Sequence, residues 1–391
     1  MRLEKPKGFK RRQKKTEDGQ KMDRSVIGEM LVKREDILVN YGSNPIQMGF
    51  EIMDALDVKA ILRKDMKIAL KPNLVVAKPA DSGATTFPGI VEGVIQYLKE
   101  NGLNNITIME SSWVGDNTRR AFEVCGYSTL SKKYSVPLLD LKSDSAASFT
   151  SDGITMKICK AALETDFLIN IPVLKGHCQT LMTCALKNLK GCIPDSEKRH
   201  FHTLGLHKPI ALLNKFLRTS LVIVDGIMGD LTFEEGGTPV RMDRVIAGCD
   251  PVLVDSYVAA LMGYRPEDVD YIMIAEKLGV GSTNLANANI VEINTGNKSP
   301  AMFSPSRKVA HLSKLINENQ ACSACYGSLI HALSRLDEAG RLGRINRKIS
   351  IGQGFKGAKN EGIGVGNCTS GFTTCIRGCP PKAVDIVREL S

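Results

Sequence analysis

A short apolar run at residues 167–174 constrains the fold more strongly than any other stretch of this chain. Its sequence is FLINIPVL, and the polar residues Asp166 and Lys175 stand on either side of it. A run that is short and almost wholly apolar is typical of a strand buried on both faces, as in a parallel sheet. We therefore predict a sheet that is covered by helices on both sides.

Strand and helix patterns alternate before this run, between residues 67 and 142. The strand patterns lie at 67–74, 105–110 and 136–141. Between them, one helix pattern begins at Thr85 or Thr86 and stops at Gly102, and a shorter one covers 119–126. This alternation is the pattern of a parallel sheet with covering helices, so the predicted fold class is α/β, with a largely parallel or mixed sheet.

Polar side chains begin where the predicted strand ends. Lys175 and His177 follow it directly, and Lys187 comes twelve residues after Lys175, across a turn or helix. Ligands bind beyond the carboxyl ends of strands in open α/β sheets, and two cations with an imidazole suit an anionic or carbonyl-bearing small molecule. We expect Lys175 to be solvated and Lys190 to point to solvent. The alternative is that Lys187 and Lys190 form a solvated helix face and that His177 caps a loop.

A second buried strand, at residues 221–224, ends in Asp225. A carboxylate at a strand terminus often binds ligands or takes part in catalysis. If the two buried strands are neighbours, Asp225 should converge with Lys175, His177 and Lys187. In this hypothesis the lysines bind or polarise the substrate, His177 is the acid/base, and Asp225 orients it or acts as a second acid/base.

Three histidines, His200, His202 and His207, lie within eight residues of one another. Their spacing is not that of a helical metal-binding pair, and no carboxylate completes a known zinc-enzyme pattern with them. We expect this segment to be a flexible substrate loop, with a metal site as the alternative.

The C-terminal segment is rich in cysteine, because five of the eleven cysteines fall within the last 70 residues. Their spacing is C-x2-C-x42-C-x6-C-x3-C-P, starting at Cys322. Four thiolates bind either an iron–sulfur cluster or zinc. The zinc interpretation selects the two short-spaced pairs, which are Cys322, Cys325, Cys375 and Cys379. The chain carries no export signal, so we expect reduced, metal-binding cysteines and a cytoplasmic location.

Five ordered motifs add a family resemblance. They are KPNLV at 71–75, TTFPGIV at 85–91, ALKNLKG at 185–191, VDGI at 224–227 and DPVLVD at 250–255. From about Leu38 to the C-terminus the chain resembles the uncharacterised domain-of-unknown-function 362 family, which is often joined to iron–sulfur modules. The resemblance implies a [4Fe–4S] cluster. Its GNC and GCPP segments favour Cys322, Cys325, Cys368 and Cys379 as the ligands. The family has no general chemistry that could be carried over.

The distribution of charge helps to divide the 391 residues. Residues 1–22 carry nine Lys or Arg and three Asp or Glu, so +6 of the net +10 lies there. The predicted parts are a basic disordered tail at 1–24, an α/β domain at 25–300 and a C-terminal cysteine module at 301–391. The chain has no 18-residue apolar run and no recognisable nucleic-acid motif, so neither a membrane span nor a nucleic-acid partner is expected.

These patterns together predict an iron–sulfur enzyme, an oxidoreductase acting on a small anionic or carbonyl-containing substrate, with a redox partner protein. The first alternative is a non-catalytic electron carrier or cluster-bearing partner of a redox system. The second is a zinc-stabilised binding module. No GxGxxG or Walker pattern occurs, so a nucleotide cofactor is not indicated.

Overall fold

The computed structural model describes residues 33–298 and 308–391. The predicted basic tail lies outside these ranges, and so does the predicted boundary between residues 300 and 301. Within the described residues, none of the helices combines the length and the apolar character that crossing a bilayer requires.

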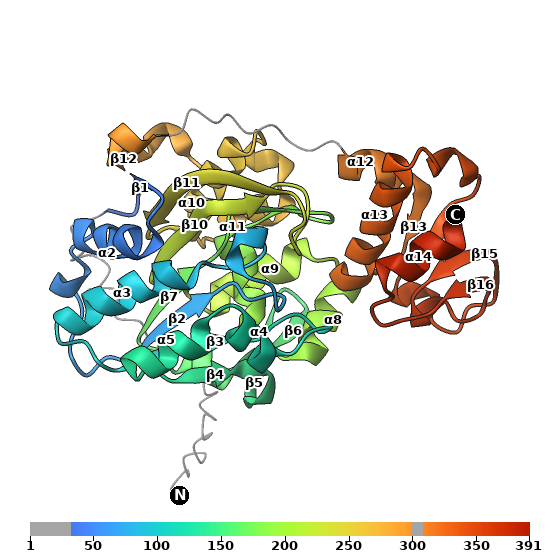
Figure 1. The fold of residues 1–391 in the computed structure, drawn as a ribbon. Coiled ribbons are helices and arrows are strands. Elements are labelled where there is room, and N and C mark those ends of the chain that lie inside the picture. The colour runs from blue at the N-terminus through green and yellow to red at the C-terminus, as the bar shows by residue number, and fades with distance from the viewer. Residues whose placement is uncertain (1–32, 299–307) are drawn as a thin grey trace, which may run out of the picture.

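An eight-stranded sheet forms the centre of the larger part of the molecule (Figure 1). The strand order is β12-β1-β11-β10-β7-β2-β3-β4, and every strand except β11 runs in the same direction. The strands are β1 (Asp36–Tyr41), β2 (Ile68–Pro72), β3 (Ile106–Glu110), β4 (Leu138–Asp140), β7 (Phe167–Ile171), β10 (Leu221–Asp230), β11 (Pro239–Gly248) and β12 (Asn289–Ile293). The predicted α/β class with a largely parallel or mixed sheet is confirmed.

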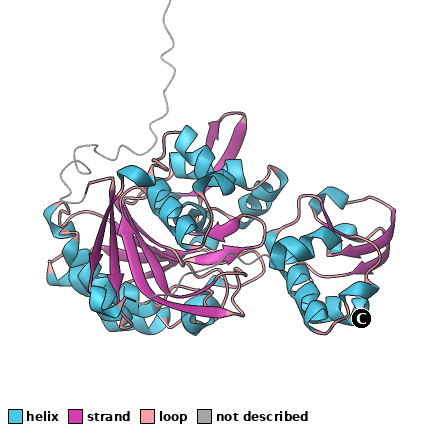
Figure 2. Ribbon diagram, turned by 90° about the horizontal axis from the view of Figure 1, so that it is seen from above, coloured by secondary structure: helices cyan, strands magenta, loops and turns pink. Residues whose placement is uncertain are grey.

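Helices cover both faces of this sheet (Figure 2). One face packs against α2 (Pro45–Ala55), α3 (Pro88–Glu100), α4 (Thr118–Val124) and α5 (Tyr127–Tyr134). The other packs against α6 (Lys160–Leu163), α7 (Ala185–Asn188), α8 (Asp195–Thr203), α9 (His207–Phe216), α10 (Pro251–Leu261) and α11 (Asp270–Lys277). Side chains alternate along each strand, so Leu221 and Ile223 of β10 enter the first core, and Val222 and Val224 enter the second.

Two hairpins interrupt the alternation of strands and helices. One is formed by β5 (Ala146–Ser151) and β6 (Ile154–Cys159), just before β7. The other is formed by β8 (Lys175–His177) and β9 (Leu181–Thr183), where the sequence predicts a turn or helix. The second hairpin carries two of the predicted site residues away from the end of β7.

The C-terminal part is a separate lobe with its own parallel sheet (Figure 1). The sheet consists of β13 (Ile316–Glu318), β14 (Ile349–Ile351), β15 (Asn360–Val365) and β16 (Phe372–Ile376). The helices are α12 (Lys308–Leu312), α13 (Ser323–Glu338) and α14 (Ala383–Leu390). A helix predicted for 329–342 is thus observed over Ser323–Glu338, and it begins directly after Cys322.

The two parts meet through the β8–β9 hairpin and the loop between β10 and β11. The side-chain amide of Gln179 donates to the Ala321 carbonyl at 3.0 Å and accepts from the Ser323 hydroxyl at 2.8 Å. The ring of Phe233 stacks on that of His331, with the ring centroids 4.1 Å apart. These contacts set the start of α13 against the larger domain.

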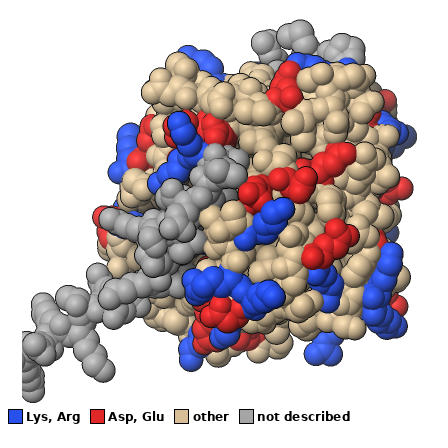
Figure 3. All heavy atoms as spheres, turned by 90° about the vertical axis from the view of Figure 1, so that its left-hand side faces the viewer, with Lys and Arg blue, Asp and Glu red and all other residues tan. Residues whose placement is uncertain are grey.

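The surface agrees with the lack of a nucleic-acid motif on the side that Figure 3 shows. Among the coloured residues there, Lys and Arg are interspersed with Asp and Glu rather than gathered into one basic patch. A mixed surface of this kind does not provide the continuous positive field that phosphate backbones require.

Candidate functional site

Glu234, in the loop between β10 and β11, gathers three of the four predicted pocket residues around it. Its carboxylate lies 2.6 Å from the Lys187 ammonium and 2.9 Å from Nε2 of His177. Its backbone carbonyl accepts a hydrogen bond from Lys175 at 2.9 Å. Burial by itself would raise the pKa of Glu234, but Lys187 and His177 hold it well below its usual range. Glu234 is therefore a buried, ionised carboxylate.

His177 is held in one tautomer by the hairpin that carries it. Its Nδ1 accepts the backbone N–H groups of Gln179 at 3.0 Å and Thr180 at 3.1 Å. Nδ1 must then be unprotonated, which leaves the ring proton on Nε2, facing Glu234. Burial, followed by the charge of Lys187, lowers the pKa of His177 to about 4, so the imidazole is neutral at pH 7.

Lys175 is completely buried, so the expectation of a solvated lysine at a strand end is wrong. Its ammonium donates to Oδ1 of Asn73 at 3.1 Å and to the carbonyls of Ala84 at 2.6 Å and Glu234 at 2.9 Å. These bonds use all three of its N–H groups. Burial lowers the pKa of Lys175 to about 8. The side chain joins three loops and leaves no donor for a ligand.

Asp225 does not join the other three residues. Strand β10 is indeed the neighbour of β7, but residues 221, 223 and 225 point to the face opposite the even-numbered ones. The Asp225 carboxylate accepts the amide of Phe87, at the start of α3, at 2.7 Å and that of Ile227 at 3.0 Å. Burial raises its pKa to about 7. The predicted four-residue convergence therefore fails at Asp225.

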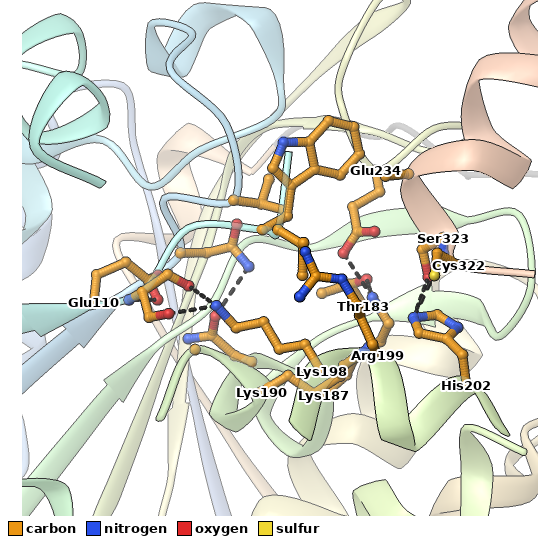
Figure 4. A pocket seen from close by; sticks show the side chains of 18 of the residues that line it. Glu110, Thr183, Lys187, Lys190, Lys198, Arg199, His202, Glu234, Cys322 and Ser323 are labelled. Atoms are coloured by element: carbon orange, nitrogen blue, oxygen red, sulfur yellow. Dashed lines mark hydrogen bonds and ion pairs between the residues drawn. The ribbon is translucent and has the colours of Figure 1, made fainter. Parts of the chain in front are cut away.

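A cavity of about 90 Å³ opens beside Lys187 and Glu234 (Figure 4). Glu110 lies at one end of the group and Cys322 with Ser323 at the other. Its charged lining consists of Lys71, Lys187, Lys190, Lys198, Arg199, Glu110 and Glu234. Five positive groups thus face two negative ones. Lys190 belongs to this lining, so the expectation that it points to solvent is wrong.

Two of these cations are held by the protein itself. Lys71 is buried and donates to Glu110 at 2.9 Å, to the Pro72 carbonyl at 2.8 Å and to Asn188 at 3.3 Å. Lys198 donates to the Ser111 hydroxyl, to the Ser111 and Ser112 carbonyls at 3.0 and 2.6 Å, and to Asp195 at 3.1 Å. These two lysines have no N–H left for a ligand.

The other three cations have N–H groups to spare. Lys187 donates to Glu234 and, at 3.1 Å, to the Thr183 hydroxyl, which leaves one N–H. For the ammonium of Lys190 and the guanidinium of Arg199, residues 33–298 and 308–391 provide no hydrogen bond or ion pair. The cavity is therefore a cationic site with unused donors.

Gly191 explains why the segment NLKG can pass so close to this polar network. A Cβ at this position would lie 2.0 Å from Oε1 of Glu110 and 2.6 Å from Nζ of Lys71. Any side chain would break the buried Lys71–Glu110 pair. Glycine is thus required by close approach rather than by backbone conformation.

A second cavity, of about 220 Å³, is lined by Cys322, Cys325, Cys368 and Cys379. The first two lie at the start of α13, and the others follow β15 and β16. The two loops are tied together by Asn367, whose side chain accepts the Gly378 amide at 2.9 Å and whose own amide donates to the Gly378 carbonyl at 3.0 Å. Four thiols thus face one space at the carboxyl ends of parallel strands.

Cys375 lies apart from this cavity. It sits within β16, and its sulfur is 3.7 Å from both the Gly366 carbonyl and the Thr369 hydroxyl. Within residues 33–298 and 308–391, no three His, Cys, Asp or Glu side chains converge on one point closely enough to hold a single metal ion. The four thiols instead surround a space. Burial and the neighbouring thiols raise the pKa of Cys325.

The two cavities share part of their walls. Cys322 and Arg199 line both of them, while Ser323 and Ala324 line only the cationic one. The start of α13 therefore separates the thiols on one side from the lysines on the other.

The histidine segment is helical rather than a flexible loop, because His200 and His202 lie in α8 and His207 begins α9. Only His202 lines the cationic cavity, with Nε2 3.5 Å from the amide and the hydroxyl of Ser323. The expectation of a flexible substrate loop is wrong for these residues.

Comparison with known proteins agrees with this arrangement. Residues 68–260 match the model of a family described as "Domain of unknown function (DUF362)". Through these residues, the chain belongs to this family. The DUF362 region holds most of the cationic cavity, including Lys71 and Asn73 of one motif and Lys187 and Lys190 of another. Their convergence is direct, since the Asn73 side chain donates to Asn188 at 2.9 Å.

Two further proteins are similar to parts of the chain. The thylakoid-associated protein sll1697 of Synechocystis is 26% identical over 228 residues, which are 56% of this chain and 69% of that protein. The lactate racemase apoprotein of Thermoanaerobacterium thermosaccharolyticum aligns with a TM-score of 0.33 and 12% identity. That alignment covers 48% of this chain and spans only half of the racemase chain.

Sequence reasoning missed Glu234, Arg199 and Lys198. Glu234 lies 47 residues after Lys187, in a loop whose position no periodic pattern predicts. The available signal was the acidic pair Glu234–Glu235 between two strand patterns. Lys71 was part of the KPNLV motif, and a lysine within a strand that is otherwise buried was the signal that could have identified it.

Proposed function

We propose that this protein is an iron–sulfur oxidoreductase whose cluster lies beside a cavity for a small anionic or carbonyl-containing substrate. One observation carries the proposal, namely that Cys322 and Arg199 line both the cysteine cavity and the cationic cavity. A group held by the four thiols would therefore be a direct neighbour of a bound anion. An electron carrier without a substrate would have no need of a cationic cavity at this place.

The donor set fits an iron–sulfur cluster. Thiolates are soft ligands, and Cys322, Cys325, Cys368 and Cys379 surround a space rather than a point. Gly366 has φ of 91°, and a Cβ there would lie 3.9 Å from the sulfur of Cys325. Its absence keeps the wall of this space open. A bound cluster of this type supplies or accepts single electrons.

The side chains of the cationic cavity then have separable roles. Lys187 presents its remaining N–H to a substrate oxygen and can polarise a carbonyl. Glu234 keeps Lys187 charged and in place, and it can accept a proton. His177 does not line the cavity, so we assign it as a positioning residue for Glu234 rather than as the acid/base of the sequence hypothesis. Lys175 holds the Glu234 backbone in the same way.

The test is made on protein purified without oxygen. The proposal expects a brown protein with broad absorbance near roughly 400 nm and about four irons and four sulfides per chain. The electron paramagnetic resonance spectrum of the reduced protein should change when 2-oxobutyrate is added. A colourless protein with one zinc per chain would refute the proposal. An iron–sulfur protein whose spectrum and rate of reoxidation ignore all small anions would favour the electron carrier.

A further inference from the structure

The cationic cavity contains more hydrogen-bond donors than the protein uses. Within the described residues, Lys190 and Arg199 have no acceptor, and Lys187 has one N–H to spare. The Trp113 indole N–H, in the same lining, is buried and has no acceptor in this part of the chain. The carboxylates of the lining, Glu110 and Glu234, already accept from lysines. The missing partner must therefore be rich in acceptors.

The size of the cavity limits this partner. A water molecule needs on the order of 10–15 Å³ of a cavity measured in this way, so about 90 Å³ holds roughly six to nine non-hydrogen atoms. Nucleotides and other drug-sized ligands need several times this volume. The partner is thus a small molecule with several oxygen atoms.

The donors fall into two groups along the cavity. Arg199 also lines the cysteine cavity, so it lies at the boundary between the two spaces. The charges that act on Lys190 include both Cys322 and Lys187, which places its ammonium between them. Lys187 itself is fixed by Glu234 and Thr183 (Figure 4). An oxyanion suits the first two side chains, and a single further oxygen suits Lys187.

We propose that this cavity binds a small 2-oxo or 2-hydroxy carboxylate, with Lys190 and Arg199 on the carboxylate and Lys187 on the second oxygen. The inference deepens the proposed function, because it names the substrate class of the same site. It needs the cationic cavity alone, however, so it can be tested separately from the cluster.

The experiment is calorimetric titration of the iron-loaded protein with four probes, which are 2-oxobutyrate, butyrate, inorganic phosphate and adenosine monophosphate. We expect 2-oxobutyrate to bind most tightly, butyrate to bind less tightly because it lacks the oxygen for Lys187, and adenosine monophosphate not to bind. Tighter binding of phosphate than of 2-oxobutyrate, or equal binding of the nucleotide, would overturn the assignment of the ligand class.

Variants test the residues. Lys190→Ala and Arg199→Ala should each weaken 2-oxobutyrate binding roughly ten- to a hundredfold, as expected for a charge-assisted contact. The matched control is Lys215→Ala, which removes an exposed lysine of α9 that does not line the cavity. It should change affinity less than about twofold. Unaltered binding by both cavity variants would overturn the inference.

Iron content and thermal melts are measured on the same preparations. An iron-loaded wild type that binds none of the small carboxylates refutes this inference and leaves the cluster proposal intact. A wild type without iron that still binds 2-oxobutyrate through Lys190 refutes the cluster proposal and supports this inference. A folded melt for each variant separates lost binding from lost structure.

Discussion

Lys187 and Glu234 lie 47 residues apart in the chain, yet the ammonium of one is 2.6 Å from a carboxylate oxygen of the other. Both side chains are buried, with 3% and 9% of their surface exposed. Each charge offsets the desolvation of the other, and His177 and Thr183 complete the hydrogen bonding. The pair thus fixes the loop between β10 and β11 against α7, and it does so at the wall of the cationic cavity.

Replacing Glu234 by Gln should destabilise the fold, because Lys187 would remain buried without its counter-charge. The expected loss in the free energy of unfolding is about 3–5 kcal/mol, the usual cost of breaking a buried pair. Urea unfolding followed by circular dichroism measures it. Glu235→Gln is the control, since Glu235 has only a 3.5 Å contact with the partly exposed His331. Equal losses in the two variants would show that the Lys187–Glu234 pair has no special weight.

Lys175→Met and Lys190→Met should have opposite effects. Removing the Lys175 ammonium strands three buried acceptors, so the free energy of unfolding should fall by about 3 kcal/mol. Removing that of Lys190 should change stability by less than about 1 kcal/mol, because no protein acceptor in the described residues depends on it. Binding of 2-oxobutyrate should be lost in the Lys190 variant. A Lys175 variant as stable as wild type would contradict a structural role for Lys175.

The pH dependence of stability should contain a contribution from His177. Its pKa is about 4 in the folded protein against 6.5 unfolded, so the unfolded chain binds more protons between these values. Stability is therefore lost as the pH falls from 6.5 towards 4, by up to ~3 kcal/mol. The groups that act on His177 are Glu234, Lys187 and Lys190.

His177→Asn is the variant that isolates this contribution. The asparagine side-chain oxygen can accept the amides of Gln179 and Thr180 as the imidazole does, but it does not titrate. Asp225 and Asp255, whose pKa values burial raises to about 7, have the opposite sign but cancel in the comparison of variant with wild type. The wild type should lose more stability than the variant between pH 7 and pH 5. Parallel curves would contradict the assignment.

The sheet was predictable because its signal is local. The run Phe167–Ile171 is apolar on both faces, and this can only be satisfied by helices on both sides. The β8–β9 hairpin was not predictable in this way. Its three-residue strands carry Lys175 and His177, whose burial depends on a loop some 60 residues later and on α13 beyond it.

The candidate site shows the same division. The four thiols could be selected from spacing and from the resemblance, since their positions follow strand ends that the sequence marks with glycine. The choice of Asp225 failed for a reason of parity, because one residue along a strand reverses the face to which a side chain points. Sequence showed that β10 carries a carboxylate after its apolar run, but it could not show that α3 begins on that face and that the Phe87 amide binds this carboxylate.

The choice of ligands gives the last prediction. Cys368→Ser should abolish or greatly reduce the iron and sulfide bound by anaerobically purified protein, because Cys368 lines the thiol cavity. Cys375→Ser is the matched control. Its sulfur lies 3.7 Å from the Gly366 carbonyl and outside that cavity, so most of the iron should remain. Iron, sulfide and the absorbance near roughly 400 nm are measured on both variants beside the wild type. If Cys375→Ser loses the iron and Cys368→Ser retains it, the ligand set is Cys322, Cys325, Cys375 and Cys379, and β16 must rearrange when metal binds.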